Sequence, residues 1–203
     1  KIVDCGNVDV LHTEQKRTFQ KCEPAVRKIL SKKAIPFVIG GDHAITTPIL
    51  RAFDCFHNLC VIHFDAHLDF SKNPHGIAEG PGSPMRRASE MAHIGKIMQI
   101  GIRGIGSSQL SDFQDAEAYG NIIITSREVR QKGVEWVAGR IPQAEYYYIS
   151  FDIDGLDPSI AIGTGSPVPF GLLYEEASAI IEAIAQRGCI VGMDMVEISP
   201  PCD

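Results

Sequence analysis

Six apolar runs rich in β-branched residues, separated by segments with helical periodicity, constrain the fold of this 203-residue chain most strongly. The runs are continuous rather than alternating, which is typical of strands covered on both faces. The expected strands are Ile35–Ile39, Leu59–Phe64, Ile97–Ile102, Asn121–Thr125, Tyr146–Ile153 and Cys189–Val196. The expected helices are Glu14–Lys33, Ala44–Phe53, Ser107–Tyr119, Arg127–Gly139 and Tyr174–Arg187. This alternation predicts an α/β fold with three layers, in which helices flank a mainly parallel sheet.

The length suits a single domain over residues 1–203, and no linker divides the chain. Both ends are abrupt, because Lys1 is not an initiator methionine and the chain stops at Asp203, directly after the last expected strand and a short Pro-Pro segment. We therefore expect one domain that lacks an N-terminal strand region and a C-terminal helix.

The composition narrows the classes of partner. Hydrophobic residues make up 44% and charged residues 22%, and the formal net charge is −6 with no stripe of basic residues, so nucleic acid is not an expected partner. No apolar run approaches the roughly 20 residues that cross a bilayer, so no membrane association is expected. The six cysteines show no close-paired metal spacing, which favours reduced thiols and a cytoplasmic location.

The densest group of candidate metal ligands is Asp65, His67 and Asp69, which follows the apolar run that ends at Phe64. An extended backbone would aim these three side chains toward one face, because successive side chains of a strand alternate. Carboxylates and an imidazole gathered at the end of an apolar run are difficult to explain as packing. The sequence therefore predicts a metal site at this strand end.

Two further groups follow other strands. His43 ends a Gly-Gly-Asp-His segment after the first expected strand. Asp152 lies at the end of the fifth, and Asp154 directly follows it. Each group alone is weaker evidence, since Asp152 and Asp154 also suit a turn before Pro158. Because the carboxyl ends of parallel strands meet at one edge of a sheet, the three groups together predict a single site.

The number and type of these side chains indicate two metal ions. Four neighbouring aspartates would repel one another and raise their pKa values unless cations neutralised them. A mixed carboxylate and imidazole set suits Mn²⁺, and less well Zn²⁺ or Fe²⁺. Two ions about 3.5–4 Å apart can share a hydroxide, so metal-assisted hydrolysis is the expected reaction class.

The ordered motifs Gly-Gly-Asp-His, Asp-Ala-His-x-Asp and Ser-Phe-Asp-x-Asp-x-x-Asp-Pro resemble those of the ureohydrolase superfamily, which includes arginase, agmatinase, guanidinobutyrase and formiminoglutamase. The resemblance extends from Asp4 to Pro200. It implies an arginase-like fold and a dimanganese hydrolase that cleaves a linear guanidino compound, agmatine or a guanidino acid, to urea and an amine or amino acid. It also implies a hydroxide that bridges the ions, and a homo-oligomer.

The same resemblance implies a role for each candidate ligand. The first Mn²⁺ would be bound by His43, Asp65, Asp69 and Asp152. The second would be bound by Asp65, His67, Asp152 and Asp154, so that Asp65 and Asp152 bridge the pair. Asp154 would also accept a hydrogen bond from the attacking hydroxide.

Two segments match the part of the family motif that contacts substrate. Glu197, in Val-Glu-Ile-Ser-Pro, stands where the family has a substrate-binding glutamate, and a carboxylate there can accept two N–H bonds from a guanidinium. Ser166 lies in a Gly-Thr-Gly-Ser-Pro loop, and its hydroxyl is expected to orient Glu197. Ile162 departs from the proline or alanine that is more usual at its position.

One departure bears on catalysis. Pro81 stands where the family has a histidine that is thought to shuttle protons, and proline cannot transfer a proton. His75, in the same loop, is the candidate to replace it, although a solvated loop histidine is the simpler interpretation. The alternative function is therefore a metal-binding but catalytically silent subunit with an assembly or regulatory role. A formiminoglutamase-like hydrolase and a single-zinc deacetylase are further alternatives.

The substrate is the least constrained feature. Arg86 is a candidate partner for a substrate carboxylate, which would favour a guanidino acid, and a solvated helix-surface arginine is the competing interpretation. Glu79 or Glu90 could instead bind the amine of agmatine.

Overall fold

The computed structural model describes residues 1–11 and 13–202, apart from the side chain of His75. At its centre is a six-stranded sheet in the order β1-β6-β5-β2-β3-β4, and all neighbouring strands are parallel. The strands are β1 (Phe37–Ile39), β2 (Leu59–Phe64), β3 (Ile94–Ile102), β4 (Ile122–Thr125), β5 (Tyr146–Asp152) and β6 (Cys189–Val196). The expected parallel sheet is confirmed.

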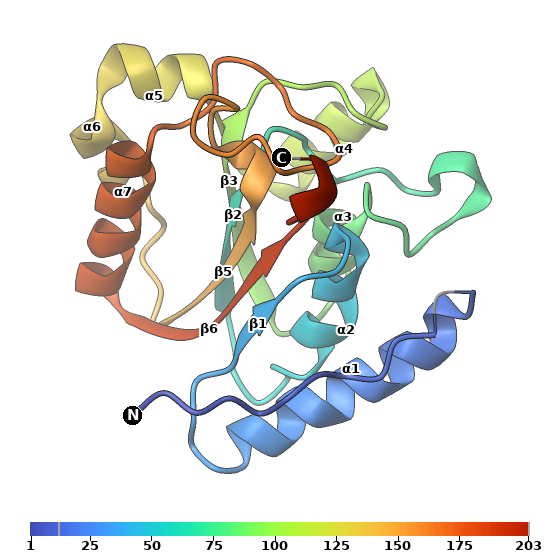
Figure 1. Cartoon of the computed structure of the whole chain (residues 1–203). Coiled ribbons are helices and arrows are strands. Elements are labelled where there is room, and N and C mark those ends of the chain that lie inside the picture. The colour runs from blue at the N-terminus through green and yellow to red at the C-terminus, as the bar shows by residue number, and fades with distance from the viewer. Residues whose placement is uncertain (12, 203) are drawn as a thin grey trace.

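Helices cover both faces of this sheet and complete the three expected layers (Figure 1). One face carries α1 (Gln15–Leu30), α2 (Thr46–Arg51), α3 (Pro84–Ser89) and α4 (Leu110–Tyr119). The other carries α5 (Ser126–Lys132), α6 (Val134–Ala138) and α7 (Tyr174–Arg187).

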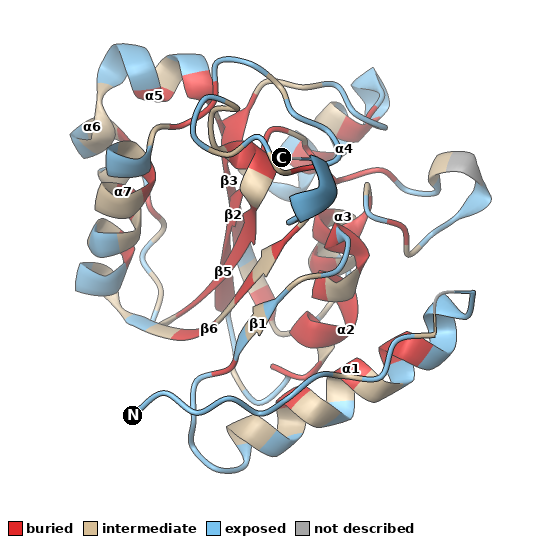
Figure 2. Cartoon of the chain, viewed as in Figure 1, coloured by how far each residue is buried: buried red, intermediate tan, exposed pale blue. Residues whose placement is uncertain are grey.

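Alternate residues of β2 pack into two hydrophobic clusters, one on each face of the sheet. Leu59 and Val61 join the cluster that includes α1 to α4, whereas Cys60, Ile62 and Phe64 join the cluster that includes α5 to α7. Every residue of β2 is buried (Figure 2). The apolar run is continuous because a strand covered on both faces has no side turned toward solvent.

The helix expected over Arg127–Gly139 is wrong in one respect. Two helices occupy this segment, and Gly133 separates them with a φ of 83°, a conformation that glycine adopts at little cost. α5 begins where Thr125 accepts a hydrogen bond from the backbone of Glu128, whose carboxylate accepts one from the backbone of Thr125.

The short helix α3 was not expected, because six residues are too few to display a helical pattern. Pro84 begins it, and proline is well tolerated in the first turn of a helix.

Among the described residues, no helix combines the length and apolar character needed to cross a membrane.

Candidate metal centre

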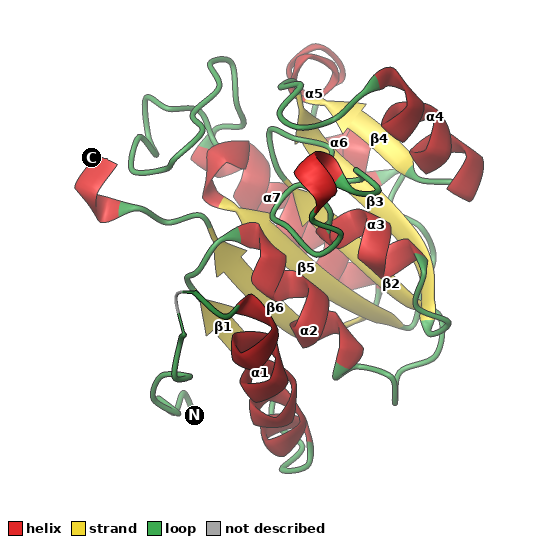
Figure 3. Ribbon diagram, turned by 90° about the vertical axis from the view of Figure 1, so that its right-hand side faces the viewer, coloured by secondary structure: helices red, strands yellow, loops and turns green. Residues whose placement is uncertain are grey.

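Four contiguous strands, β1, β6, β5 and β2, end next to predicted site residues, and Figure 3 shows them side by side. His43 begins a 3-10 turn after β1, Asp65 follows β2, Asp152 ends β5 and Glu197 follows β6. Because the strands are parallel, their carboxyl ends lie at one edge of the sheet. The fold therefore brings together segments that are far apart in the sequence, as expected.

The first group of candidate ligands surrounds the imidazole of His43. Its Nδ1 lies 3.1 Å from Asp65 Oδ2, 3.0 Å from Asp69 Oδ2 and 3.2 Å from Asp152 Oδ2. All four residues are buried. Three carboxylates with one imidazole are a donor set that a divalent cation such as Mn²⁺ accepts.

The second group shares Asp65 with the first. His67 Nδ1 lies 3.4 Å from Asp65 Oδ1 and 3.0 Å from Asp154 Oδ2, and these three residues could hold a second ion. The two oxygens of Asp65 therefore face different groups, Oδ2 toward His43 and Oδ1 toward His67. A carboxylate in this arrangement can bridge two cations.

The backbone that carries these ligands is not extended, contrary to the sequence-based expectation. β2 ends at Phe64, and Asp69 has a φ of 51°, in the left-handed region. Glu197 has a φ of 58°. Such a conformation at a non-glycine residue costs on the order of 1–3 kcal/mol and is concentrated at functional sites. Asp65, His67 and Asp69 thus converge through a loop rather than through strand alternation.

The crowded carboxylates raise the pKa values of several groups in the centre, so that these groups hold protons more tightly. Burial, together with the charge of Asp65, raises the pKa of Asp152 well above its ordinary value. Burial lowers the pKa of His43, but the facing carboxylates, that of Asp152 foremost, raise it well above its ordinary value. Hydrogen bonds to Asp154 and Asp65 raise the pKa of His67 to about 11. Metal cations at this position would take the place of these protons.

A buried hydrogen-bond chain turns one nitrogen of His43 toward the carboxylates. Asp194 accepts hydrogen bonds from Tyr148 Oη at 2.6 Å, Ser150 Oγ at 2.9 Å and Thr46 Oγ1 at 3.0 Å. Because Ser150 gives its hydrogen to Asp194, its oxygen accepts the Nε2–H of His43 at 3.0 Å. His43 Nδ1 is buried without a hydrogen-bond partner, so its lone pair is available to a cation. The residues therefore fit a metal ion.

Asp194 and Gln99 were not among the predicted site residues, and Ser150 had no assigned role. All three are fully buried within strands. A polar residue that interrupts an apolar strand is the signal that marks them, since burying such a group is unfavourable unless it is hydrogen-bonded.

Glu197 lies beside the first group of ligands. Its Oε1 accepts a hydrogen bond from the backbone N–H of His43 at 2.8 Å, and its carboxylate is half-buried. Ser166 is exposed, and the link between its loop and Glu197's segment is a backbone hydrogen bond from Ser199 to Gly163 at 2.8 Å. The structure therefore brings the two segments together, but the backbone of His43 orients the Glu197 carboxylate.

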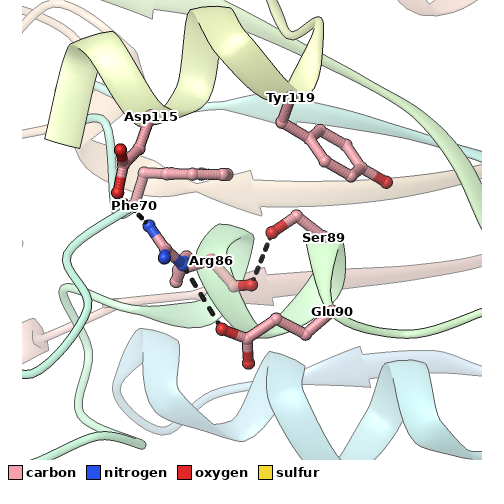
Figure 4. A pocket seen from close by; sticks show the side chains of 6 residues that line it. All are labelled: Phe70, Arg86, Ser89, Glu90, Asp115 and Tyr119. Atoms are coloured by element: carbon pink, nitrogen blue, oxygen red, sulfur yellow. Dashed lines mark hydrogen bonds and ion pairs between the residues drawn. The ribbon is translucent and has the colours of Figure 1, made fainter.

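Arg86 does not reach the centre. Its guanidinium donates to Asp115 Oδ2 at 2.6 Å and to Glu90 Oε1 at 3.3 Å, and it lies over the ring of Phe70 (Figure 4). These groups line a separate surface pocket together with Tyr119. Because two carboxylates already neutralise the guanidinium, the structure gives no support to the predicted contact with a substrate carboxylate.

The loop that contains His75 and Pro81, where the sequence departs from the family motif, is only partly described by the structure. Pro81 is exposed, and Glu79 pairs with Arg51 rather than facing the centre. His75 lies in the 3-10 turn Pro74–Gly76, and its side chain is outside the described part of the structure. Its proposed replacement of the family histidine stays a prediction.

Comparison with known proteins identifies the family. The Arginase family model matches residues 1–203. Guanidino acid hydrolase, mitochondrial, from Homo sapiens is 34% identical over 212 residues, which cover 100% of this chain and 58% of that protein. Agmatinase, mitochondrial, from Gallus gallus is also 34% identical over 212 residues, which cover 100% of this chain and 61% of that protein.

A solved structure extends the agreement to the fold. Proclavaminate amidino hydrolase from Streptomyces clavuligerus superposes with a TM-score of 0.89 at 32% sequence identity, over 99% of this chain and 68% of that chain. The family match spans every residue, and the fold and the order of the ligand segments are those the motifs predict. The chain belongs to the arginase family.

Proposed function

We propose that this chain forms the catalytic centre of a hydrolase that cleaves a linear guanidino compound to urea and an amine or amino acid. The observation that carries the proposal is that the two carboxylate oxygens of Asp65 face different histidines. Oδ2 lies 3.1 Å from His43 Nδ1, and Oδ1 lies 3.4 Å from His67 Nδ1. A carboxylate in this position suits two adjacent cations. Relatives named for guanidino substrates support the substrate class.

The ligand sets follow from the two groups. One ion would be bound by His43, Asp65, Asp69 and Asp152. The other would be bound by Asp65, His67 and Asp154. Asp152 would be a further shared ligand, as the family resemblance implies. Mn²⁺ is the proposed metal because it accepts both carboxylate and imidazole ligands. When bound, two such ions supply a nucleophile at neutral pH and a Lewis acid.

Glu197 would bind the guanidinium of the substrate. The N–H of His43 holds its Oε1 at 2.8 Å, which fixes the carboxylate beside the ligands of the first ion. A carboxylate held in this way can accept two parallel N–H bonds from a planar guanidinium. Burial raises the pKa of Glu197, and a bound cationic guanidinium would favour its charged form.

Asp154 would accept a hydrogen bond from the attacking nucleophile. Its Oδ1 accepts a hydrogen bond from the backbone N–H of Ala66 at 3.0 Å, and its Oδ2 lies on the side of His67. The carboxylate is therefore held in one orientation, with one oxygen directed toward the centre.

A substrate panel tests the proposal. Purified protein supplied with Mn²⁺ is given agmatine, 4-guanidinobutyrate, arginine and formiminoglutamate, and urea or formamide is measured. Asp154→Asn serves as the control for contaminating activity. We expect urea from agmatine or from 4-guanidinobutyrate, since relatives named for agmatine and for guanidino acids match this chain equally well. Formamide release would indicate the formiminoglutamase-like alternative.

Pro81 motivates a second candidate function, a metal-binding subunit without turnover. One general acid–base group contributes typically about 10²–10⁴-fold, so its loss would slow the reaction without removing metal binding. Two bound ions with no product from any substrate of the panel would favour this candidate.

We also propose a cytoplasmic location and a homo-oligomer. All six cysteines are free thiols, which a reducing compartment preserves. Light scattering coupled to gel filtration, at several protein concentrations, tests the oligomeric state.

A further inference from the structure

A row of buried polar side chains lies beneath the candidate ligands, on four adjacent strands. Gln99 on β3 pairs in register with His63 on β2, His63 with Ser150 on β5, and Ser150 with Asp194 on β6. All four residues are fully buried. Most polar groups at this depth are hydrogen-bonded, and each residue of the row has at least one partner.

The orientation of the Gln99 side-chain amide is set by its neighbours. One amide atom lies 2.6 Å from the carbonyl oxygen of Leu68, which can only accept, so this atom is the nitrogen Nε2. The other, Oε1, accepts a hydrogen bond from Asn121 Nδ2 at 2.8 Å. The second hydrogen on Gln99 Nε2 points to His63 Nδ1, at 3.0 Å.

This orientation decides where His63 carries its hydrogen. A hydrogen on Nδ1 would meet the N–H of Gln99, so Nδ1 accepts and the hydrogen lies on Nε2. His63 Nε2 is 2.8 Å from Asp65 Oδ2 and therefore donates to it. His63 lies close enough to His43, Asp65 and Asp69 to share a metal ion with them. In this tautomer, however, its Nε2 carries a hydrogen and has no lone pair for a metal ion.

We propose that Gln99 is a positioning residue, which keeps His63 as a donor and so fixes the orientation of the Asp65 carboxylate. Asp65 Oδ1 accepts a hydrogen bond from the backbone N–H of His67 at 2.5 Å, so both oxygens of the carboxylate are held. The inference rests on the proposed function, in which Asp65 is the ligand shared by both ions. In the opposite tautomer, the lone pair of Nε2 would face Asp65 Oδ2, repel it and compete with it for a cation.

Gln99→Glu tests the inference directly. An ionised glutamate at this position has no hydrogen to donate and would accept one from His63 Nδ1, so the neutral tautomer with its hydrogen on Nε2 alone is no longer favoured. The tautomer is read from a long-range ¹H–¹⁵N spectrum of histidine-labelled protein loaded with diamagnetic Zn²⁺, with His63→Gln to assign the signal. Mn²⁺ affinity is measured in parallel by calorimetry. Gln131→Glu, an exposed change of the same chemistry on α5, is the matched control.

In the wild type we expect the hydrogen of His63 on Nε2. In Gln99→Glu we expect a hydrogen on Nδ1, together with an Mn²⁺ affinity about 10–100-fold weaker, the usual effect of removing a hydrogen-bond partner behind a metal ligand. Gln131→Glu should match the wild type in both measurements. Gln99→Met, which removes the donor without adding a charge, should also weaken Mn²⁺ binding and lose the preference for the Nε2–H tautomer.

A wild-type spectrum with the hydrogen on His63 Nδ1, or unchanged Mn²⁺ affinity in both Gln99 variants, would overturn the inference. Neither readout requires turnover. Failure of the proposed function is recognised separately, as two bound ions without product from any guanidino substrate.

Discussion

His43 and Ser150 are 107 residues apart in the sequence, yet the imidazole Nε2 of one donates to the hydroxyl oxygen of the other at 3.0 Å. This bond turns the second ring nitrogen of His43 toward Asp65, Asp69 and Asp152. The tautomer of a candidate metal ligand is thus decided by a residue of β5 and not by the ligand's own loop.

Ser150→Ala is expected to weaken Mn²⁺ binding about 10–100-fold, because His43 loses the acceptor that holds its ring orientation. The fold should persist, since the change removes only one hydroxyl. Calorimetric titration with Mn²⁺ measures the effect, and Ser31→Ala, at the exposed end of α1, is the control. Equal affinities in the two variants would argue against the role of Ser150.

Metal binding should release protons from the centre near neutral pH. Without metal, the facing carboxylates raise the pKa of His43 well above its ordinary value, and hydrogen bonds to Asp154 and Asp65 raise the pKa of His67 to about 11. Both histidines then carry a proton that a cation must displace, so Mn²⁺ affinity should fall as the pH falls. Calorimetry in buffers of different ionisation enthalpy counts the protons. Affinity independent of pH between about 6.5 and about 8.5 would contradict the assignment.

Asp154→Ala is expected to reduce the metal content from two ions to one and to abolish most of the activity. The second ion would retain His67 as its only unshared ligand, with Asp65 and Asp152 both shared with the first ion, which is too weak a set to hold it. Elemental analysis after gel filtration measures the stoichiometry. The surface variant Asp9→Ala, which removes only an exposed ion pair with Lys21, should keep both ions. Two ions and normal turnover in Asp154→Ala would exclude the proposed role.

Glu197→Gln separates substrate binding from metal binding. The amide oxygen can still accept the N–H of His43, but the charge and one acceptor for the guanidinium are lost. Because charged hydrogen bonds contribute about 1.5–3 kcal/mol each, KM should rise at least about 10-fold while the metal content remains unchanged. A lower metal content at unchanged KM would instead make Glu197 part of the metal site.

Arg86→Ala should lower stability rather than substrate affinity. The guanidinium contacts Asp115, Glu90 and the ring of Phe70, so its removal should cost about 1 kcal/mol of unfolding free energy. Urea denaturation measures this cost. The KM values for agmatine and for 4-guanidinobutyrate should both be unchanged. A rise in KM for the guanidino acid alone would support the predicted contact between Arg86 and a substrate carboxylate.

Much of the fold was predictable because its signals are local. β2 and β6 begin and end where the apolar runs do, and α7 matches its predicted bounds. A buried strand leaves a continuous apolar run in the sequence, and a helix buried along one stripe leaves a periodic pattern. The break at Gly133 and the short helix α3 were missed because neither changes these patterns enough.

The candidate ligands themselves were also accessible from the sequence, since a carboxylate or imidazole directly after an apolar run has few structural explanations. The structure brings His43, Asp65 and His67 together as predicted. Strand alternation was the wrong reason, because a loop with a left-handed Asp69 achieves the convergence.

The sequence by itself therefore determined the layered sheet and the identity of the side chains at its carboxyl edge, because hydrophobic patterning and motif spacing are properties of short segments. Only the tertiary structure decided which nitrogen of His43 and of His63 carries the hydrogen, and that Arg86 pairs with Asp115. These depend on partners from distant strands and helices, and a hydrogen bond between such partners leaves no periodic trace along the chain.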